Sequence, residues 1–178
     1  SLAFFTSAYS SYSGCRQYRE NIIAACSDIG PAAPVVHKLR AFYNHPGFIN
    51  PMIENVRKAI AKIPSTDLER TKVFFTAHSI PNSMADGCDY VIQLEEASRL
   101  VSEAVEIEDY ALVYQSRSGP PQQPWLEPDI CDAISAAHEK DKIEHVVIVP
   151  IGFISDHMDV LFDLDTEAKP RKIQDLRY

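Results

Sequence analysis

Two short apolar runs constrain the fold more than any other feature of this sequence. Val-Phe-Phe at residues 73–75 and Val-Val-Ile-Val at residues 146–149 are apolar on both faces of a strand. Such strands are typical of a parallel sheet that helices cover on both sides. Strands are predicted over residues 2–8, 35–42, 72–78, 111–115 and 145–150. Helical patterns alternate with them over residues 15–26, 46–63, 90–105, 128–139 and 156–168. This alternation predicts an α/β fold, a three-layer sandwich with a mainly parallel sheet.

Length and composition narrow the class of protein. The chain has 178 residues, which suits one α/β domain over residues 1–178. Only 6 glycines and 4 cysteines exclude a collagen-like, low-complexity or disulfide-scaffold protein. No apolar run approaches the roughly 18 residues that a transmembrane helix needs. Residues 1–13 lack the pattern of a secretory signal and look like a strand, so we expect a fragment of a longer protein.

Charge and cysteine spacing exclude several functions. The net charge of −8 argues against nucleic acid or an anionic membrane as a partner. Residues 90–178 carry 8 basic and 18 acidic side chains; such an acidic half can attract cations, although a solvated surface is the commoner cause. No Cys-x-x-Cys pair occurs, which disfavours a zinc knuckle. We therefore expect reduced thiols and a cytoplasmic location.

One histidine follows a predicted buried strand directly. The segment Thr-Ala-His-Ser-Ile-Pro at residues 76–81 places His78 where ligands bind in open α/β sheets, outside the carboxyl ends of the strands. Pro81 restricts the backbone of Ile80 and makes this turn rigid. At such a position an imidazole can act as a general base or a metal ligand. The alternative is a histidine that only binds loop backbone.

An acidic segment follows the last predicted strand. Five carboxylates and no lysine or arginine occur between Asp156 and Glu167. In a helix, Asp159, Asp163 and Glu167 spread over roughly 80° of one face. Like charges at this spacing disfavour a helix, so the ladder suits a site that meets a cation or handles protons. A hydrated acidic surface explains the pattern equally well.

A proline-rich loop at residues 116–128 surrounds the only tryptophan, Trp125. Its prolines restrict a long loop to few conformations, and loops of this length are often functional. Arg117 can hold an acidic ligand, and Trp125 can present a flat apolar wall. Packing within the protein is the favoured interpretation for Trp125.

The segments 76–81, 114–128 and 152–167 resemble the ferrochelatase family in residues, order and spacing. Residues 7–18 also resemble the start of the second half of these enzymes. The resemblance implies a lyase of haem biosynthesis, whose two α/β halves enclose a porphyrin. It also implies that this chain is the second, catalytic half, without the first half or the C-terminal tail, and inactive alone. The loop at residues 116–121 is most similar to actinobacterial-type enzymes, which implies coproporphyrin III rather than protoporphyrin IX.

The resemblance also implies roles for the acidic segment and the histidine. His78 matches the family's proton acceptor and metal contact. Asp159 stands where the family usually has a glutamate that acts beside that histidine, and both are expected to be catalytic and metal-binding. Aspartate is one methylene shorter, and an error of about 1 Å in position can cost about 10²-fold in rate. Asp163 and Glu167 are expected to relay protons or metal.

Four further residues are expected to bind the substrate by the same resemblance: Tyr12, Ser116, Arg117 and Trp125. Ferrous iron is expected as a substrate, with no tightly bound cofactor. Some members hold an iron–sulfur cluster; Cys15 lies near one ligand position, but the remaining ligands would lie in the absent tail, so no cluster is expected. The expected partners are porphyrin, ferrous iron and the missing first half.

Two other functions remain open at this point. One is a non-catalytic module that binds a tetrapyrrole or a metal. The other is a chelatase for another metal such as cobalt; that family shares the architecture but lacks the proline-rich loop.

Overall fold

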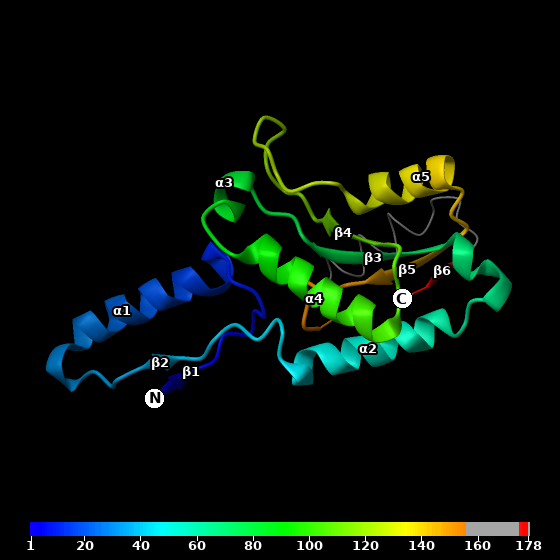
Figure 1. Cartoon of the computed structure of the whole chain (residues 1–178). Coiled ribbons are helices and arrows are strands. Elements are labelled where there is room, and N and C mark those ends of the chain that lie inside the picture. Colours follow the sequence, from blue (N-terminus) through cyan, green and yellow to red (C-terminus); the bar gives the residue numbers. More distant parts are fainter. Residues whose placement is uncertain (156–174, 178) are drawn as a thin grey trace.

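A parallel four-stranded sheet forms the centre of the molecule (Figure 1). The structure, a computed structural model, describes residues 1–155 and 175–177. The strand order is β4-β3-β5-β6, and all neighbours run parallel. The strands are β3 (Thr71–His78), β4 (Tyr110–Gln115), β5 (His145–Val149) and β6 (Asp175–Arg177). Strand β3 is therefore an inner strand, paired along both edges.

Helices cover both faces of this sheet. On one face, α2 (Pro46–Ile60) and α4 (Tyr90–Val105) pack against inward-facing side chains such as Phe75. On the other face, α5 (Ile130–Asp141) packs against Phe74. Successive residues of β3 thus enter opposite cores, as the pleat of a strand requires. The predicted three-layer α/β sandwich is confirmed.

Local signals place the helix boundaries. Helix α5 begins after Asp129, whose side chain accepts a 2.8 Å hydrogen bond from the backbone N–H of Cys131. Pro46 occupies the first turn of α2, where the N–H that proline lacks would have no partner within the helix. Helix α2 ends at Ile60, three residues before the predicted end. The prediction for α4 is confirmed to the residue. A short helix, α3 (Asn82–Ala85), lies between the end of β3 and α4.

The first two predicted strands form within their predicted ranges but are much shorter than predicted. Only β1 (Leu2–Ala3) and β2 (His37–Lys38) form, and they pair with each other, outside the main sheet. Beyond Ala3 and Lys38 the regular ladder ends, although the two segments stay adjacent: the carbonyl of Ala8 accepts hydrogen bonds from the N–H groups of both Phe42 and Tyr43. A run of apolar residues forms a strand only where a neighbour pairs with it.

The N-terminal helix and the last strand differ from the prediction. The helix predicted over 15–26 is a π-helical turn (Tyr12–Arg16) followed by α1 (Gln17–Ile29). Strand β6 was not predicted. The helix predicted over 156–168 lies outside the described residues. None of the helices in the described part of the chain is sufficiently long and apolar to span a membrane.

Candidate active site

His78 is the last residue of β3, at the carboxyl end of the inner strand. Its ring is half-buried, and Nδ1 lies 2.6 Å from the carbonyl oxygen of Ser79. Because a carbonyl oxygen only accepts hydrogen bonds, Nδ1 must carry the proton. The neutral ring then has a free lone pair on Nε2, and the described part of the chain provides no hydrogen-bond partner for it. A nitrogen in this state can accept a proton or bind a metal.

The backbone around His78 is fixed by two neighbouring elements. The hydroxyl of Tyr90, the first residue of α4, donates a 3.1 Å hydrogen bond to the carbonyl oxygen of His78. The N–H of Ser79 donates to the carbonyl of Gln115 at the end of β4, at 2.8 Å. Burial raises the pKa of the Tyr90 hydroxyl well above its usual range, so it remains a donor. Hydrogen bonds to α4 and to the end of β4 therefore hold the backbone that carries the imidazole in place.

The proline-rich loop is bound directly to the histidine segment. The hydroxyl of Ser79 donates to the carbonyl of Leu126 at 2.8 Å, and the N–H of Leu126 donates to the carbonyl of Ile80 at 3.0 Å. The N–H of Asn82 donates to the carbonyl of Pro124, also at 3.0 Å. These bonds hold two segments, some forty residues apart in sequence, as one unit.

Within the loop, Arg117 and Trp125 both make internal contacts. One terminal nitrogen of Arg117 donates to the carbonyls of Pro121 and Gln123, at 3.2 and 3.1 Å. Gly119 lies so close to the indole of Trp125 that a Cβ at this position would overlap it. The indole Nε1 is buried and finds no acceptor among the described residues. Trp125 thus packs inside its own loop, while the predicted contacts of both residues with substrate stay predictions.

Ser116 begins the loop immediately after β4 with a positive φ of 62°. This left-handed conformation is uncommon for a residue other than glycine, and it turns the chain sharply away from the strand. The role of Ser116 in binding substrate stays a prediction.

Residues 7–18 are joined to the same end of the sheet. The hydroxyl of Tyr9 donates to the carbonyl of Ile151, just after β5, at 2.8 Å. Ser10 and Gln93 exchange two hydrogen bonds, of 2.7 and 3.0 Å. Burial raises the pKa of Tyr9 far above its usual range, which keeps this phenol protonated. The segment is thus tied both to the sheet and to α4.

Tyr12 lies at the surface beside a cavity with a mixed polar and apolar wall. Its hydroxyl donates to Glu20 at 3.2 Å, and the guanidinium of Arg16 lies 5.9 Å from the ring centre. A cavity of about 490 Å³ has Tyr12, Pro81 and Gln123 in its wall. Residues 7–18, Pro81 of the histidine segment and the proline-rich loop therefore line one cavity, but His78 itself is not part of its wall.

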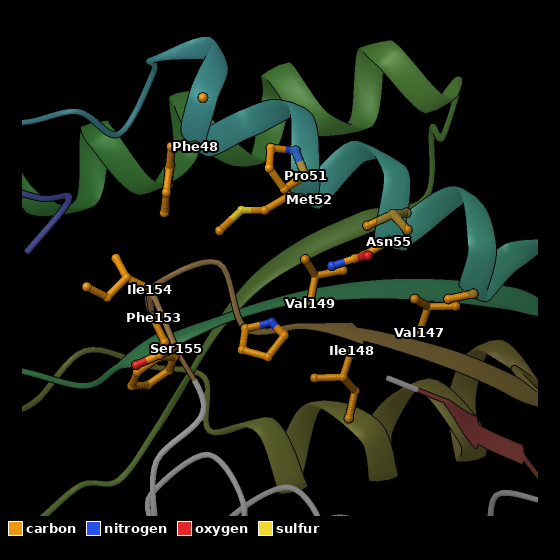
Figure 2. A pocket seen from close by; sticks show the side chains of 14 residues that line it. Phe48, Pro51, Met52, Asn55, Val147, Ile148, Val149, Phe153, Ile154 and Ser155 are labelled. Atoms are coloured by element: carbon orange, nitrogen blue, oxygen red, sulfur yellow. The ribbon is translucent and has the colours of Figure 1, made fainter.

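A second, mainly apolar cavity of about 420 Å³ lies between α2 and β5 (Figure 2). Figure 2 shows Phe48 and Met52 on the helix side and Val149 on the sheet side. Ser155, the last residue before the acidic segment, also lines it. His78 is not part of its wall, so this cavity is separate from the histidine.

The acidic residues predicted to work beside His78, Asp159, Asp163 and Glu167, lie outside the described residues. Within the described residues no group of three or more His, Cys, Asp or Glu side chains is positioned to hold a metal ion. The metal-binding prediction for His78 and Asp159 therefore stays a prediction.

Three positioning residues were missed by sequence reasoning. Tyr9 and Tyr90 tie other elements to the site by their hydroxyls, and their rings meet edge-on at 6.1 Å. Gly152 allows close approach, because a Cβ there would lie 2.6 Å from the Cβ of Ala77. The sequence does contain a signal for Gly152, since a glycine directly after a buried strand suggests such an approach. Nothing in the sequence distinguishes the two tyrosines from other core aromatics.

The fold and His78 define a class of protein: a parallel α/β protein with an imidazole ready to accept a proton or a metal at the carboxyl ends of its strands. The sequence model of the ferrochelatase family matches residues 1–174, and the chain belongs to this family. It is 62% identical to the ferrochelatase of Rhodopirellula baltica over 168 residues, 94% of this chain and 48% of that protein. It is 46% identical to the coproporphyrin III ferrochelatase of Streptomyces coelicolor over 185 residues, 94% of this chain and 49% of the relative. The chain thus spans about half the length of these relatives.

Proposed function

We propose that this chain supplies the catalytic part of an enzyme that inserts ferrous iron into a porphyrin during haem biosynthesis. The observation that carries the proposal is the 2.6 Å contact between Nδ1 of His78 and the carbonyl oxygen of Ser79, which assigns the ring proton to Nδ1. This leaves Nε2 with a lone pair at the carboxyl ends of the strands, where ligands bind in open α/β sheets. By the family resemblance, His78 is the proton acceptor.

The reaction sets a clear demand on the site. A free porphyrin carries two pyrrole N–H protons, and both must leave as Fe²⁺ binds the four nitrogens. In the proposed mechanism, Nε2 of His78 first contacts the incoming iron, a borderline cation that accepts imidazole and carboxylate ligands. Once the iron has moved to the ring nitrogens, the freed lone pair accepts one pyrrole proton, and Asp159 accepts the other. Asp159 acts beside His78, and Asp163 and Glu167 conduct protons out or metal in.

Coproporphyrin III is the proposed substrate. The relatives of Streptomyces coelicolor and of Nocardia farcinica, the latter 44% identical over 178 residues, are both named coproporphyrin III ferrochelatases. Tyr12, Ser116, Arg117 and Trp125 are the proposed porphyrin contacts. Ferrous iron enters as substrate, without a tightly bound cofactor. The four cysteines are free thiols, in keeping with a cytoplasmic location.

A chimaera tests the proposal in a complete protein. This chain replaces the matching 168 residues of the Rhodopirellula baltica ferrochelatase. Under anaerobic conditions with ferrous iron and coproporphyrin III, we expect the absorbance of the iron porphyrin to develop. In the His78→Ala variant, insertion should fall at least about 10²-fold while porphyrin still binds, because general base catalysis contributes about 10²–10⁴-fold.

Other outcomes would identify the alternatives. Tight porphyrin binding without insertion of any metal would favour the non-catalytic module. Insertion of Co²⁺ but not of Fe²⁺ would favour a cobalt chelatase. An unchanged rate in His78→Ala would refute the role of the imidazole.

A further inference from the structure

The cavity beside Tyr12 differs in charge from the chain as a whole. The chain has a net charge of −8, yet the wall of this cavity of about 490 Å³ includes three basic side chains and no acidic one. The basic residues are Arg16, Arg19 and Lys38. Charges of one sign that line a cleft attract ions of the opposite sign, because the protein walls focus their field. The cavity therefore favours an anionic ligand.

Two of these three cations have no acidic partner. The guanidinium of Arg16 donates to the carboxylate of Glu20 at 3.0 Å, which largely neutralises its charge. Neither Arg19 of α1 nor Lys38 of β2 forms an ion pair with any residue that the structure describes. The ammonium of Lys38 lies 5.4 Å from the centre of the Phe5 ring, a contact that leaves its charge in place. Arg19 and Lys38 are thus free to bind an anion.

The same wall also supplies hydroxyl groups, from Ser10, Ser11 and Ser83. The Oγ of Ser11 accepts a 2.8 Å hydrogen bond from the N–H of Gly14, and the Oγ of Ser10 accepts one of 3.0 Å from the side chain of Gln93. Because both oxygens are acceptors in these bonds, each hydroxyl keeps its own proton to donate. A carboxylate accepts several hydrogen bonds on its two oxygens, so it suits this combination of cations and hydroxyls.

The position of the cavity suits the edge of a porphyrin. Pro81, three residues after His78, is in the wall, whereas His78 itself is not. The nitrogens that exchange protons for iron lie at the centre of a porphyrin, and its propionate carboxylates lie at the periphery. A porphyrin whose centre faces Nε2 of His78 would therefore extend its periphery, and not its centre, into the cavity.

We propose that Arg19 and Lys38 bind a propionate carboxylate of the porphyrin and so favour substrates with many carboxylates. Coproporphyrin III carries four propionates and protoporphyrin IX two, so each additional carboxylate site favours the former. The choice of ligand rests on the proposed function, whereas the attraction of the cavity for an anion does not depend on it.

Two forms of the same porphyrin test the site. Fluorescence titration of the chimaera gives the Kd of coproporphyrin III and of its tetramethyl ester, which has the same ring but no carboxylate. In Arg19→Gln/Lys38→Gln, affinity for coproporphyrin III should fall at least about tenfold, because hydrogen bonds to a charged group are lost. Affinity for the ester should stay within about twofold. Lys58→Gln is the matched control, because Lys58 is exposed on α2 and lies outside the cavity.

Two results of this titration would overturn the proposal. An equal loss of affinity for the acid and the ester would show that the variant alters the shape of the cavity and not a charge interaction. Unchanged affinity for both would show that neither cation contacts the porphyrin.

Alkylation of Cys15 gives a second measurement, which needs neither porphyrin nor iron. Cys15 lines the cavity, and Cys26, also a free thiol, does not. Iodoacetate is an anion and iodoacetamide is neutral, but both react with the same thiolate, so the ratio of their rates at one cysteine reports the attraction of the anion. In the Arg19→Gln/Lys38→Gln chimaera, peptide mass spectrometry should show this ratio several-fold lower at Cys15 and unchanged at Cys26. An unchanged ratio at Cys15 would overturn the proposal.

These results are distinguishable from a failure of the proposed iron insertion. A chimaera that binds coproporphyrin III through Arg19 and Lys38 but inserts no metal would support the carboxylate site and refute only the insertion. A chimaera that inserts iron, with the same porphyrin affinity in Arg19→Gln/Lys38→Gln, would refute only the carboxylate site.

Discussion

The hydroxyl of Tyr90 donates a hydrogen bond of 3.1 Å to the main-chain oxygen of His78. The first residue of α4 thus determines where the last residue of β3 stands, although no substrate atom needs to touch Tyr90. This bond acts on the backbone, so it positions the imidazole without engaging either ring nitrogen.

Removing the Tyr90 hydroxyl should loosen the end of β3. In Tyr90→Phe, the net loss of one hydrogen bond should lower the free energy of unfolding by about 1 kcal/mol, measured by urea denaturation. In the chimaera, iron insertion should fall several-fold with little change in porphyrin affinity. Tyr18→Phe, on the exposed side of α1, should change neither quantity. Unaltered insertion in Tyr90→Phe would contradict the positioning role.

Gly152 should tolerate no side chain. A Cβ there would lie 2.6 Å from the Cβ and 2.7 Å from the Cα of Ala77, so Gly152→Ala should push the turn after β5 away from β3. Overpacking of this kind costs about 1–3 kcal/mol, which urea denaturation would detect. Gly87→Ala is the control, because its nearest neighbouring atom would be 3.6 Å away. Equal stability of the two variants would show that the turn adjusts freely.

Alkaline pH should destabilise the protein through its buried phenols. Burial, with a smaller contribution from Glu95, raises the pKa of Tyr114 to about 12, from 10.0. Between pH 10 and 12 the unfolded chain therefore binds fewer protons than the folded chain, and stability falls as the pH rises. Tyr114→Phe should recover up to about 1 kcal/mol of this loss at pH 11, after allowance for partial solvent screening. Urea denaturation of both proteins at pH 8 and 11 measures this recovery.

Arg117→Ala separates the two roles considered for this arginine. If the guanidinium mainly holds the loop through the carbonyls of Pro121 and Gln123, the amide of Gln123 should exchange several-fold faster. If it mainly binds a porphyrin carboxylate, porphyrin affinity should fall without faster exchange. We expect both changes, faster exchange and weaker porphyrin binding, because Arg117 holds the loop and is also a proposed porphyrin contact. Ser118→Ala, an exposed position in the same loop, should leave both measurements unchanged.

Asp159 should matter more for iron insertion than Glu167. The proposed mechanism places Asp159 beside His78 and Glu167 at the far end of the proton path. In the chimaera, Asp159→Asn should therefore slow insertion more strongly than Glu167→Gln, by about tenfold or more in rate. Steady-state rates under anaerobic conditions measure the difference. The opposite ranking would place the working carboxylate further along the segment.

The sequence predicts the central sheet well for a physical reason. Strands β3 and β5 are buried on both faces, so nearly every side chain in them must be apolar, and this leaves an unbroken pattern. The histidine could be placed at their carboxyl end because it follows such a run directly. The tautomer of its ring depends on the carbonyl of Ser79, and only the three-dimensional arrangement shows that contact.

The failures have an equally physical origin. Residues 2–8 and 35–42 are rich in apolar residues, as strands are, but most of each run finds no neighbouring strand here. Pairing is a property of two segments, so the pattern in one of them does not determine it. The hydrogen bonds from Arg117 to the carbonyls of its own loop could not be predicted from the sequence either. A guanidinium on a loop can bind an anion as well as nearby carbonyl oxygens, and the sequence does not distinguish the two.

Because β3 is paired along both edges, the elements of the protein should unfold in a fixed order when it is heated. The elements β1, α1 and β2, which have no buried residues, can detach by local opening at little cost to the rest. The strand that ends at His78 can separate only when the cooperative core melts as a whole. The imidazole should therefore keep its geometry when only β1, α1 and β2 unfold.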